Sequence, residues 1–559
     1  MKRFVWIPLS LLPVGLFAIG PQDLNRPTPP PEARLRDHKI VEKAGKTEEG
    51  VVNDENQVLV ESLDGIVIAP DAASALKMQA RIRKGVEVEG FSEHEAAAIR
   101  KIAEQRVGKP VTLAELNDLL EKLEQHSRDH GHMLRRVSFP AQEITTGVVA
   151  IRMGPSDTGR VRVSGDPSFG MDFATEVFRT RPGVAVDEAV ILDDIDWLNE
   201  NPLRRATISY AAGEGEDDLD LTLRLKSPKP WRVYGGFDNQ LSESLGDERA
   251  FLGFQHGNVF GLDHRITAQV TSAMESESLL GASVIHEMPL VGRHLLEISG
   301  GYTTSETDVA GPLDQSGEFG RAAVMHRMQL PRWHGIAHEW RTGMEFRNND
   351  YLFPDGSSQT VRFFQLETGW KGRRSDRFGT SQVALGMLYS PGQGVFGSDD
   401  EDFIALGADG AESLILRTDL ERSLRLGKYG SLVTRLRAQW SDSKLLSSDQ
   451  ISAGGMTRVR GFDEVVGYAS SGMVGNIEWQ SPAWSVPHAG DLLGVCFIDG
   501  AVLDRDSKSD TGELLSTGFG ARWRWSEHFY GRLDCGFPLE NPDNIDSNPM
   551  WHFAVGFNW

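Results

Sequence analysis

The chain has few cysteines, no long apolar run beyond its first twenty residues, and too few basic residues to balance its acids. Two cysteines in 559 residues cannot supply a disulfide framework. After residue 20 the sequence holds no uninterrupted apolar stretch of the length that a membrane-spanning helix requires. The formal net charge of -22 argues against nucleic-acid binding, which depends on basic patches. Membrane strands are not excluded, because only every second residue of such a strand must be apolar.

Sequence motifs of common enzymes are also missing. The chain has no G-x-S-x-G, no H-E-x-x-H and no phosphate-binding G-x-x-x-x-G-K, so we expect neither enzymatic activity nor a cofactor. His126, His130 and His132 have the spacing of metal ligands, but no cysteine or close carboxylate completes a set. We therefore expect no metal site. A chain of this length is too long for one core, and several domains are expected.

The first twenty residues have the pattern of a secretory signal peptide. They begin Met-Lys-Arg, continue with an apolar run from Phe4 to Phe17, and end with the small residues Ala18 and Gly20. This arrangement predicts removal of the peptide near Gly20. The alternative is a permanent membrane anchor, which is disfavoured because the apolar run is short and contains two prolines.

The next two segments are harder to place. Residues 21–56 are rich in proline and then in charge, so they cannot bury enough apolar surface to order themselves, and we predict a linker. Residues 57–83 contain Val58–Val60 and Gly65–Ile68, which look like short strands. The sequence leaves open which part of the fold these strands join.

An internal repeat follows, with a period of about 75 residues. Val86-x-Val88-x-Gly90 recurs as Val161-x-Val163-x-Gly165, and each copy continues with two helical and two strand patterns. The helices of the first copy are predicted to start at Ser92 and Thr112, because each is followed three residues later by the glutamate of a capping box. The paired strands are predicted at Arg135–Ile144 with Gly147–Met153, and at Arg204–Ala211 with Leu219–Leu225.

Residues 230–559 consist of short segments that alternate apolar and polar residues and show no helical periodicity. There are about sixteen of them, which is typical of a bacterial outer-membrane barrel. In the last segment Trp551 and Phe553 share one face and His552 takes the other; Arg522, in another segment, is placed inward. An arginine on the lipid face would cost roughly 2–4 kcal/mol, so the facing is strongly determined. A soluble sandwich is the alternative, but its outer face would be polar.

One stretch between two such segments reads as a long loop. Gly454 and Gly455 allow a sharp turn, and Gly461 allows the backbone beside Arg460 to approach another surface. An arginine at such a bend is expected to meet a carboxylate, and Asp499 is the predicted partner because alternation places it on the polar face of a nearby strand. Phe497 shares that face and is expected to pack against the loop near Gly461 and Phe462. The alternatives are a solvated loop arginine and a lumen phenylalanine without a partner.

Several stretches resemble motifs of the Omp85 superfamily. Val459-Arg460-Gly461-Phe462 resembles its sixth-loop VRGY/F motif, and Phe497-Ile498-Asp499-Gly500 resembles its FxDxG motif, although Ala501 replaces the last glycine. The glycine pair ahead of Val459 is most similar to the two-partner-secretion branch, the transporters of the haemolysin secretion/activation type. The two α+β repeats are similar to POTRA domains, and Leu198–Arg205 resembles the LNxxPxR stretch that ends the second POTRA domain.

The resemblance implies α+β POTRA domains followed by an all-β transmembrane barrel of about 16 antiparallel strands. It also implies that the loop near residues 454–463 folds into the lumen, where Arg460 meets Asp499, and that Phe557 and Trp559 form an outer-membrane assembly signal. Family members often carry a plug helix, for which Ala33–Lys46 is the only candidate; we favour the linker. The expected organisation is a signal peptide (1–20), a linker (21–56), a strand-containing segment (57–83), POTRA 1 (84–157), POTRA 2 (158–228) and the barrel (230–559).

The function implied is export of a large secreted partner of haemolysin or adhesin type from the periplasm to the cell surface, without nucleotide hydrolysis. The POTRA domains would lie in the periplasm and bind the unfolded partner by strand addition, at sheet edges near Val137 and Thr207 and beside the first POTRA helix. Outer-membrane lipid and the outer-membrane assembly machinery are the other expected partners. Nucleic acid is not an expected partner. The protein is expected to be a monomer. One alternative is an Omp85-type assembly factor, which would usually carry more POTRA repeats. Another is a passive porin-like channel, which would need none.

Overall fold

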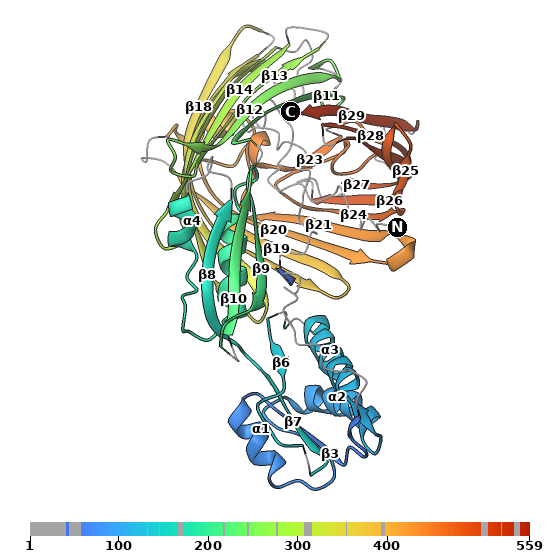
Figure 1. Cartoon of the computed structure of the whole chain (residues 1–559). Coiled ribbons are helices and arrows are strands. Elements are labelled where there is room, and N and C mark those ends of the chain that lie inside the picture. Colours follow the sequence, from blue (N-terminus) through green and yellow to red (C-terminus); the bar gives the residue numbers. More distant parts are fainter. Residues whose placement is uncertain are drawn as a thin grey trace.

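Two α/β units precede a closed β-barrel in the computed structural model (Figure 1). The structure describes residues 41–43, 58–130, 132, 134–144, 146–165, 171–215, 218–227, 229–242, 245–274, 278–306, 316–353, 355–392, 397–464, 466–504, 512–526, 528–540 and 548–559. The predicted signal peptide and most of the predicted linker lie outside these residues. None of the helices in the described ranges combines the length and the apolar character needed to cross a membrane.

The first α/β unit is built on a four-stranded sheet in the order β4-β3-β7-β6. Strand β3, from the segment that the sequence left unplaced, lies between β4 and β7, runs parallel to both and is buried along its whole length. Its bounds and those of its neighbours are β2 Val58–Val60, β3 Gly65–Ala69, α1 Ala72–Gln79, β4 Gly85–Val88, α2 Glu93–Ala103, η2 Glu104–Arg106, β5 Val111–Thr112, α3 Leu113–Asp129, β6 Arg136–Ser138 and β7 Val148–Gly154.

Helices cover both faces of this sheet. On one face α2 and α3 bury Ile99, Leu119 and Leu123 against alternate residues of β3, and on the other α1 buries Ala75 and Met78 against the remaining ones. The predicted caps are confirmed, because Ser92 caps α2 and Thr112 forms a capping box at the start of α3. Helix α1 was not predicted, since eight residues are too few for a clear helical period.

The second α/β unit has the predicted order of strand, helix, helix, strand, strand. Its elements are β8 Asp157–Gly165, α4 Met171–Val177, α5 Glu188–Leu198, β9 Arg205–Ala212 and β10 Asp218–Lys226. A further strand, β1 Val41–Lys43, runs parallel to β9 at the edge of this sheet, with Val41 opposite Ile208. The predicted linker is therefore not structureless at these three residues, because the unpaired backbone groups of an edge strand offer hydrogen bonds even to a short segment.

The barrel has sixteen antiparallel strands, which confirms the predicted fold class. It closes between β11 and β29, with Gly235 opposite Phe557. A short strand, β25 Trp484–Val486, continues the edge of β24 along β26. The barrel strands are β11 Trp231–Asp238, β12 Arg249–Val259, β13 His264–Ala273, β14 Leu279–Leu290, β15 His294–Ser305, β16 Ser316–Trp333, β17 Ile336–Leu352, β18 Ser358–Asp376, β19 Gly379–Pro391, β20 Glu412–Arg425, β21 Ser431–Ser441, β24 Ser471–Gln480, β26 Gly490–Asp504, β27 Gly512–Trp525, β28 Phe529–Glu540 and β29 Met550–Asn558.

Side chains alternate across the barrel wall as the sequence predicts. On β29 Trp551 is 52% exposed on the outside, whereas His552 is fully buried inside. On β27 Phe519 and Trp523 are exposed and Arg522 is buried. The apolar side chains therefore face outward and the charged ones line the lumen.

Among its described residues, the region for which no helix was expected contains the α-helix α6 and two single-turn 3-10 helices, η4 Gly427–Tyr429 and η5 Ser447–Asp449. Helix α6, Asp400–Ala405, lies in the connection between β19 and β20 and begins at a capping box on Asp399. Its Phe403 packs in an apolar cluster with Phe319 and Phe363, which belong to barrel strands. Six residues cannot display a helical period, so the sequence pattern could not show it.

The second α/β unit lies at one end of the barrel (Figure 1). Charged residues join it to the turns there. Arg332, at the end of β16, donates from Nε to Oδ1 of Asp193 (3.1 Å) and from Nη2 to Oδ2 of Asp196 (2.5 Å), both on α5. Arg293, in the turn after β14, pairs with Asp194 on the same helix. Three aspartates of α5 thus meet arginines from two hairpins.

A second contact uses the stretch that resembles LNxxPxR. Arg204 donates from Nη1 to Oδ1 of Asp263 (2.7 Å) and from Nη2 to Oδ2 (3.2 Å), and its Nε donates to the carbonyl of Leu198 (2.9 Å). Asn201 donates to the same aspartate (2.9 Å). Asp263 lies in the turn between β12 and β13, so this buried pair joins the second unit to the barrel.

We predict that Arg204→Ala loosens this contact, because it strands the buried carboxylate of Asp263 at a cost of about 3–5 kcal/mol. Hydrogen exchange of the full chain should show faster exchange in α5. Adding Asp263→Asn should restore part of the protection, since the amide carries no charge. Arg160→Ala is the control, because its ion pairs are exposed and worth little. Unchanged exchange in Arg204→Ala would contradict the assignment.

Candidate functional site in the barrel lumen

The connection between β21 and β24 folds into the barrel. Its stem is a two-stranded sheet of β22 Ile451–Ala453 and β23 Gly467–Ala469, and residues 454–464 between them form what we call the lumen loop. Gly454 and Gly455 have φ angles of 109° and 81°, which glycine adopts most easily. A Cβ on Gly455 would lie 2.2 Å from a carboxylate oxygen of Glu464, so the predicted sharp turn requires glycine.

Hydrogen bonds within the lumen loop fix its shape. The Gly455 amide donates to the carbonyl of Phe462 (3.1 Å), and the Met456 amide donates to the carboxylate of Glu464 (2.8 Å). Arg458 Nη1 lies 3.8 Å from the same carboxylate. The loop is therefore a compact unit that presents Arg460 in a fixed direction.

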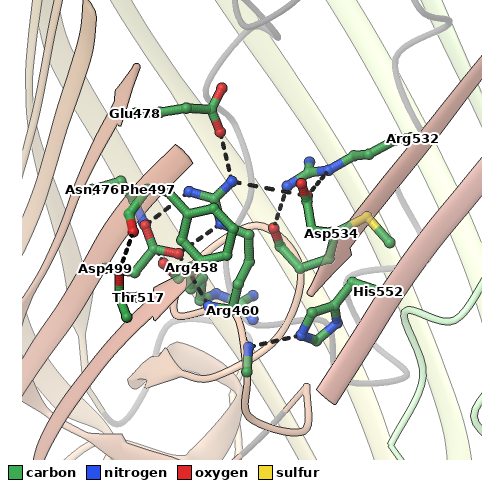
Figure 2. A network of polar contacts seen from close by, with 12 residues as sticks. Arg458, Arg460, Asn476, Glu478, Phe497, Asp499, Thr517, Arg532, Asp534 and His552 are labelled. Atoms are coloured by element: carbon green, nitrogen blue, oxygen red, sulfur yellow. Dashed lines mark hydrogen bonds and ion pairs between the residues drawn. The ribbon is translucent and has the colours of Figure 1, made fainter. Parts of the chain in front are cut away.

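Arg460 reaches Asp499 on β26, the residue that the sequence pairs with it (Figure 2). The guanidinium donates from Nε to Oδ2 (2.7 Å) and from Nη2 to Oδ1 (2.9 Å), which is the two-pronged geometry that arginine forms with a carboxylate. The Arg460 backbone amide also donates to Oδ2 (3.2 Å). Arg460 is 3% exposed and Asp499 is fully buried, so this is a dry contact.

Further charged residues complete the site. Arg460 donates from Nη1 to Glu478 on β24 (2.5 Å) and lies 3.8 Å from Asp534 on β28. Arg522 on β27 donates to both of these carboxylates, at 3.3 and 2.6 Å, and Arg532 on β28 donates to Asp534 at 2.6 Å. Three arginines thus face three carboxylates in the lumen, which compensates the charges that burial would otherwise penalise.

Phe497 supports the guanidinium from one side. The Arg460 Cζ atom lies 3.5 Å from the centre of the phenyl ring, a cation–π contact that strengthens when water is excluded. A Cβ on Gly518 would lie 2.4 Å from the ring, so the glycine makes room for it. The sequence placed this ring near Gly461 and Phe462, and the structure shows that its described partner in the lumen loop is the side chain of Arg460.

The apolar residues of the loop motif lie in a different cluster. Val459 and Phe462 are buried together with Val474, Leu503 and Leu514 of the wall. Ala501, which replaces the last glycine of the FxDxG pattern, belongs to the same cluster, so its methyl group contributes to the packing under the loop. Gly500, by alternation, takes the outward face of β26.

The two aromatic residues of the expected assembly signal lie at the closure of the barrel. Phe557 is opposite Gly235 of β11 and Phe529 of β28. Trp559 exchanges two backbone hydrogen bonds with Val233, and its side chain is 59% exposed. Neither residue contacts the lumen loop, and their role in assembly stays a prediction.

The backbone of Gly461 makes two contacts that the sequence did not reveal. Gly461 has a φ of 93°, and its amide donates to Nε2 of His552 on β29 (3.0 Å). It also lies against Gly536 on β28, where a Cβ would be 2.3 Å from the Gly461 nitrogen. Sequence alternation places Asp534 and His552 inward, but only the path of the loop shows which inward residues it meets.

The histidines that have ligand-like spacing do not form a metal centre in the part of the chain that is described. The rings of His126 and His130 are 4.1 Å apart, and among the described residues no three His, Cys, Asp or Glu side chains gather as metal ligands. Burial lowers the pKa of His126 and of His132. Both imidazoles therefore favour the neutral form.

We predict that Gly536→Ala displaces the lumen loop, because the new methyl group has no space beside Gly461. Trypsin should then cleave the folded protein near Arg458 and Arg460, which are protected in the native chain. Gly386→Ala is the matched control, since its Cβ would have no neighbour closer than 4.0 Å. Equal protection of the Gly536→Ala and Gly386→Ala proteins would contradict the close packing.

Known proteins match both parts of the chain. A family model described as haemolysin secretion/activation protein ShlB/FhaC/HecB matches residues 215–523, and one described as POTRA domain, ShlB-type, matches residues 82–156. The outer membrane transporter CdiB of Escherichia coli O6:K15:H31 (strain 536 / UPEC) is 23% identical over 454 residues, which cover 76% of this chain and 74% of that protein. The heme/hemopexin transporter protein HuxB of Haemophilus influenzae (strain 86-028NP) is 22% identical over 179 residues, so the alignment covers only 31% of either chain.

Solved structures share the fold. CdiB from Escherichia coli superimposes with a TM-score of 0.64 at 16% identity, covering 94% of both chains. CdiB from Acinetobacter baumannii gives 0.58 at 15% identity, covering 93% of this chain and 94% of that one. Because the first family model matches more than half of the sequence, the chain belongs to the haemolysin secretion/activation protein family ShlB/FhaC/HecB.

Proposed function

We propose that this chain exports a large secreted partner protein, of haemolysin or adhesin type, through the outer membrane without nucleotide hydrolysis. The barrel lies in the outer membrane and the POTRA domain lies in the periplasm. The observation that carries the proposal is the lumen loop, which an otherwise closed wall binds through the buried Arg460. Family membership favours export over barrel assembly or passive conduction.

The lumen loop lies where an exported polypeptide would pass. It contacts wall residues on β24, β26, β28 and β29, so it crosses the lumen beside one half of the barrel. The lumen loop is bound to the wall by charge pairs, and the attraction within these pairs is strong only when water is excluded. We infer that passage of the partner requires this contact to loosen and then to form again.

The two α/β units are suited to bind an unfolded partner. We propose that both are POTRA domains, with the first extended toward the N-terminus to include β3. An extended partner segment can add to the edge of a sheet by backbone hydrogen bonds. Strand β6, which contains Val137, is at such an edge, whereas β9, which contains Thr207, already bears β1. We therefore favour the β6 edge as the first contact, together with the start of α2, whose Glu95 pairs with Arg135 directly before β6.

We further propose that the translocator acts as a monomer. All sixteen barrel strands are paired on both sides, so the barrel itself offers no edge for a second copy. We predict that the gene next to this one encodes a large secreted repeat protein. That protein would be the exported partner.

We predict that Arg460→Ala and Asp499→Ala each abolish secretion of that partner while the barrel still inserts. Either change leaves a buried charge without its partner, at a cost of about 3–5 kcal/mol to the closed arrangement of the loop. Secretion is measured as partner protein in the medium, and insertion as barrel in the outer-membrane fraction.

Arg422→Ala is the control for these variants. Arg422 belongs to the same barrel but pairs with Asp376 in a partly exposed contact, so its loss should leave secretion unchanged. Normal secretion by the Arg460→Ala or Asp499→Ala chain would refute the role assigned to the pair.

A further inference from the structure

An imidazole on the lumen wall holds the lumen loop through its backbone. His552 lies on β29, is fully buried, and stands opposite Asp534 of β28. Its Nε2 atom accepts a hydrogen bond from the backbone nitrogen of Gly461, 3.0 Å away. Figure 2 shows the position of the His552 ring beside the polar network of Arg460. This contact is separate from the Arg460–Asp499 pair, because it involves another strand and the next residue of the loop.

The contact is possible for only one protonation state of the ring. A backbone amide can donate a hydrogen bond but cannot accept one, so the Nε2 atom of His552 must be the acceptor and carry no proton. The proton of the neutral ring is then on Nδ1. This atom is buried and has no hydrogen-bond partner among the residues that the structure describes. The neutral ring with its proton on Nδ1 is therefore the form that binds the loop.

The strand that carries the ring is held in place beside the lumen loop. Asn239, directly after β11, makes hydrogen bonds to the backbone on both sides of His552 and so fixes the strand. The charged groups around the ring are Arg532 and Asp534 of β28 and Arg460 of the lumen loop. A change in the charge of the ring therefore acts on the lumen loop from a wall strand that stays in place.

The loop is packed closely enough for a small change to matter. Gly461 touches Gly536, and a Cβ on either residue would come within 2.8 Å of the other's backbone. The amide therefore sits between the wall glycine and the imidazole. A second N–H on Nε2 would face the Gly461 N–H, which removes a buried hydrogen bond and opposes two donors.

We propose that His552 is a positioning residue that holds the lumen loop in place only while its ring is neutral, so that acid releases the loop at Gly461. The inference rests on the proposed function insofar as the lumen loop is the closure of an export path. It adds that acid pH is the condition under which the lumen loop is released. The residue that responds, His552, lies on β29, the strand that pairs with β11 to close the barrel.

The test measures ion conductance of the full chain in planar lipid bilayers, from about pH 7.5 to about pH 4. His552→Gln keeps an acceptor near the position of Nε2 but does not titrate. His552→Phe keeps the ring shape and has no acceptor. The lumen carboxylates are the same in all three proteins, so they contribute the same acid response to each.

We expect the conductance of the native chain to rise about tenfold on acidification, the factor that corresponds to loss of one buried hydrogen bond of ordinary strength. The His552→Gln chain should show only the smaller response that the lumen carboxylates contribute to all three proteins, and the His552→Phe chain should already be raised at the starting pH. A native chain without an acid response, or a His552→Gln chain with the native response, would overturn the proposal. If His552→Phe does not insert, the other two proteins decide.

The conductance experiment needs no secreted partner, so it is independent of the export assay. A chain that exports its partner but shows no acid response refutes only the role of His552. A chain that responds to acid but exports nothing refutes the proposed function and leaves the role of His552 intact.

Discussion

The positive charge of Arg460, buried in the barrel among carboxylates, sets the conditions for much of the remaining structure. A charge with 3% exposure must be compensated by groups held in place, and here they come from β24, β26 and β28. Those strands are neighbours with β27 between the last two, and their register sets the height of each carboxylate along the wall. The arginine can therefore reach its partners only when this part of the wall is paired in register, and the loop that carries it needs the tight turn that Gly454 and Gly455 provide.

Side chains alternate along each barrel strand between the lipid outside and the lumen inside. The same strand that presents Trp551 to lipid presents His552 to the loop, so a slip by one residue would place charge in lipid and apolar groups in the lumen. Where the loop touches the wall, glycine replaces larger residues on both sides of the contact, at Gly461 and Gly536. At the other end, ion pairs such as Arg204 with Asp263 hold the second α/β unit against the turns. The molecule thus combines an apolar exterior with an interior held largely by charge.

The sequence predicted what depends on local periodicity and on short motifs. The strand count, the facing of the strands and the helix caps at Ser92 and Thr112 follow from patterns within a few residues. The Arg460–Asp499 pair follows from two short motifs together with the alternation that places Asp499 inward. Asp534 and His552 were recognisable only as inward-facing and Glu478 was not predicted, because their contact with the loop depends on how distant strands meet. Helices α1 and α6 were missed because they are too short to show a period, and β1 because three residues carry no strand signal.

The central place of β3 has a practical consequence for work on isolated fragments. The family model for the first unit begins at residue 82, after this strand. A fragment cut there would lose the strand that joins β4 to β7, and with it the partners that cover Val149 and Ile151. Its sheet would separate into two pieces with exposed apolar faces, which favours aggregation. Recombinant versions of this unit should therefore start ahead of Val58, so that the sheet can assemble whole.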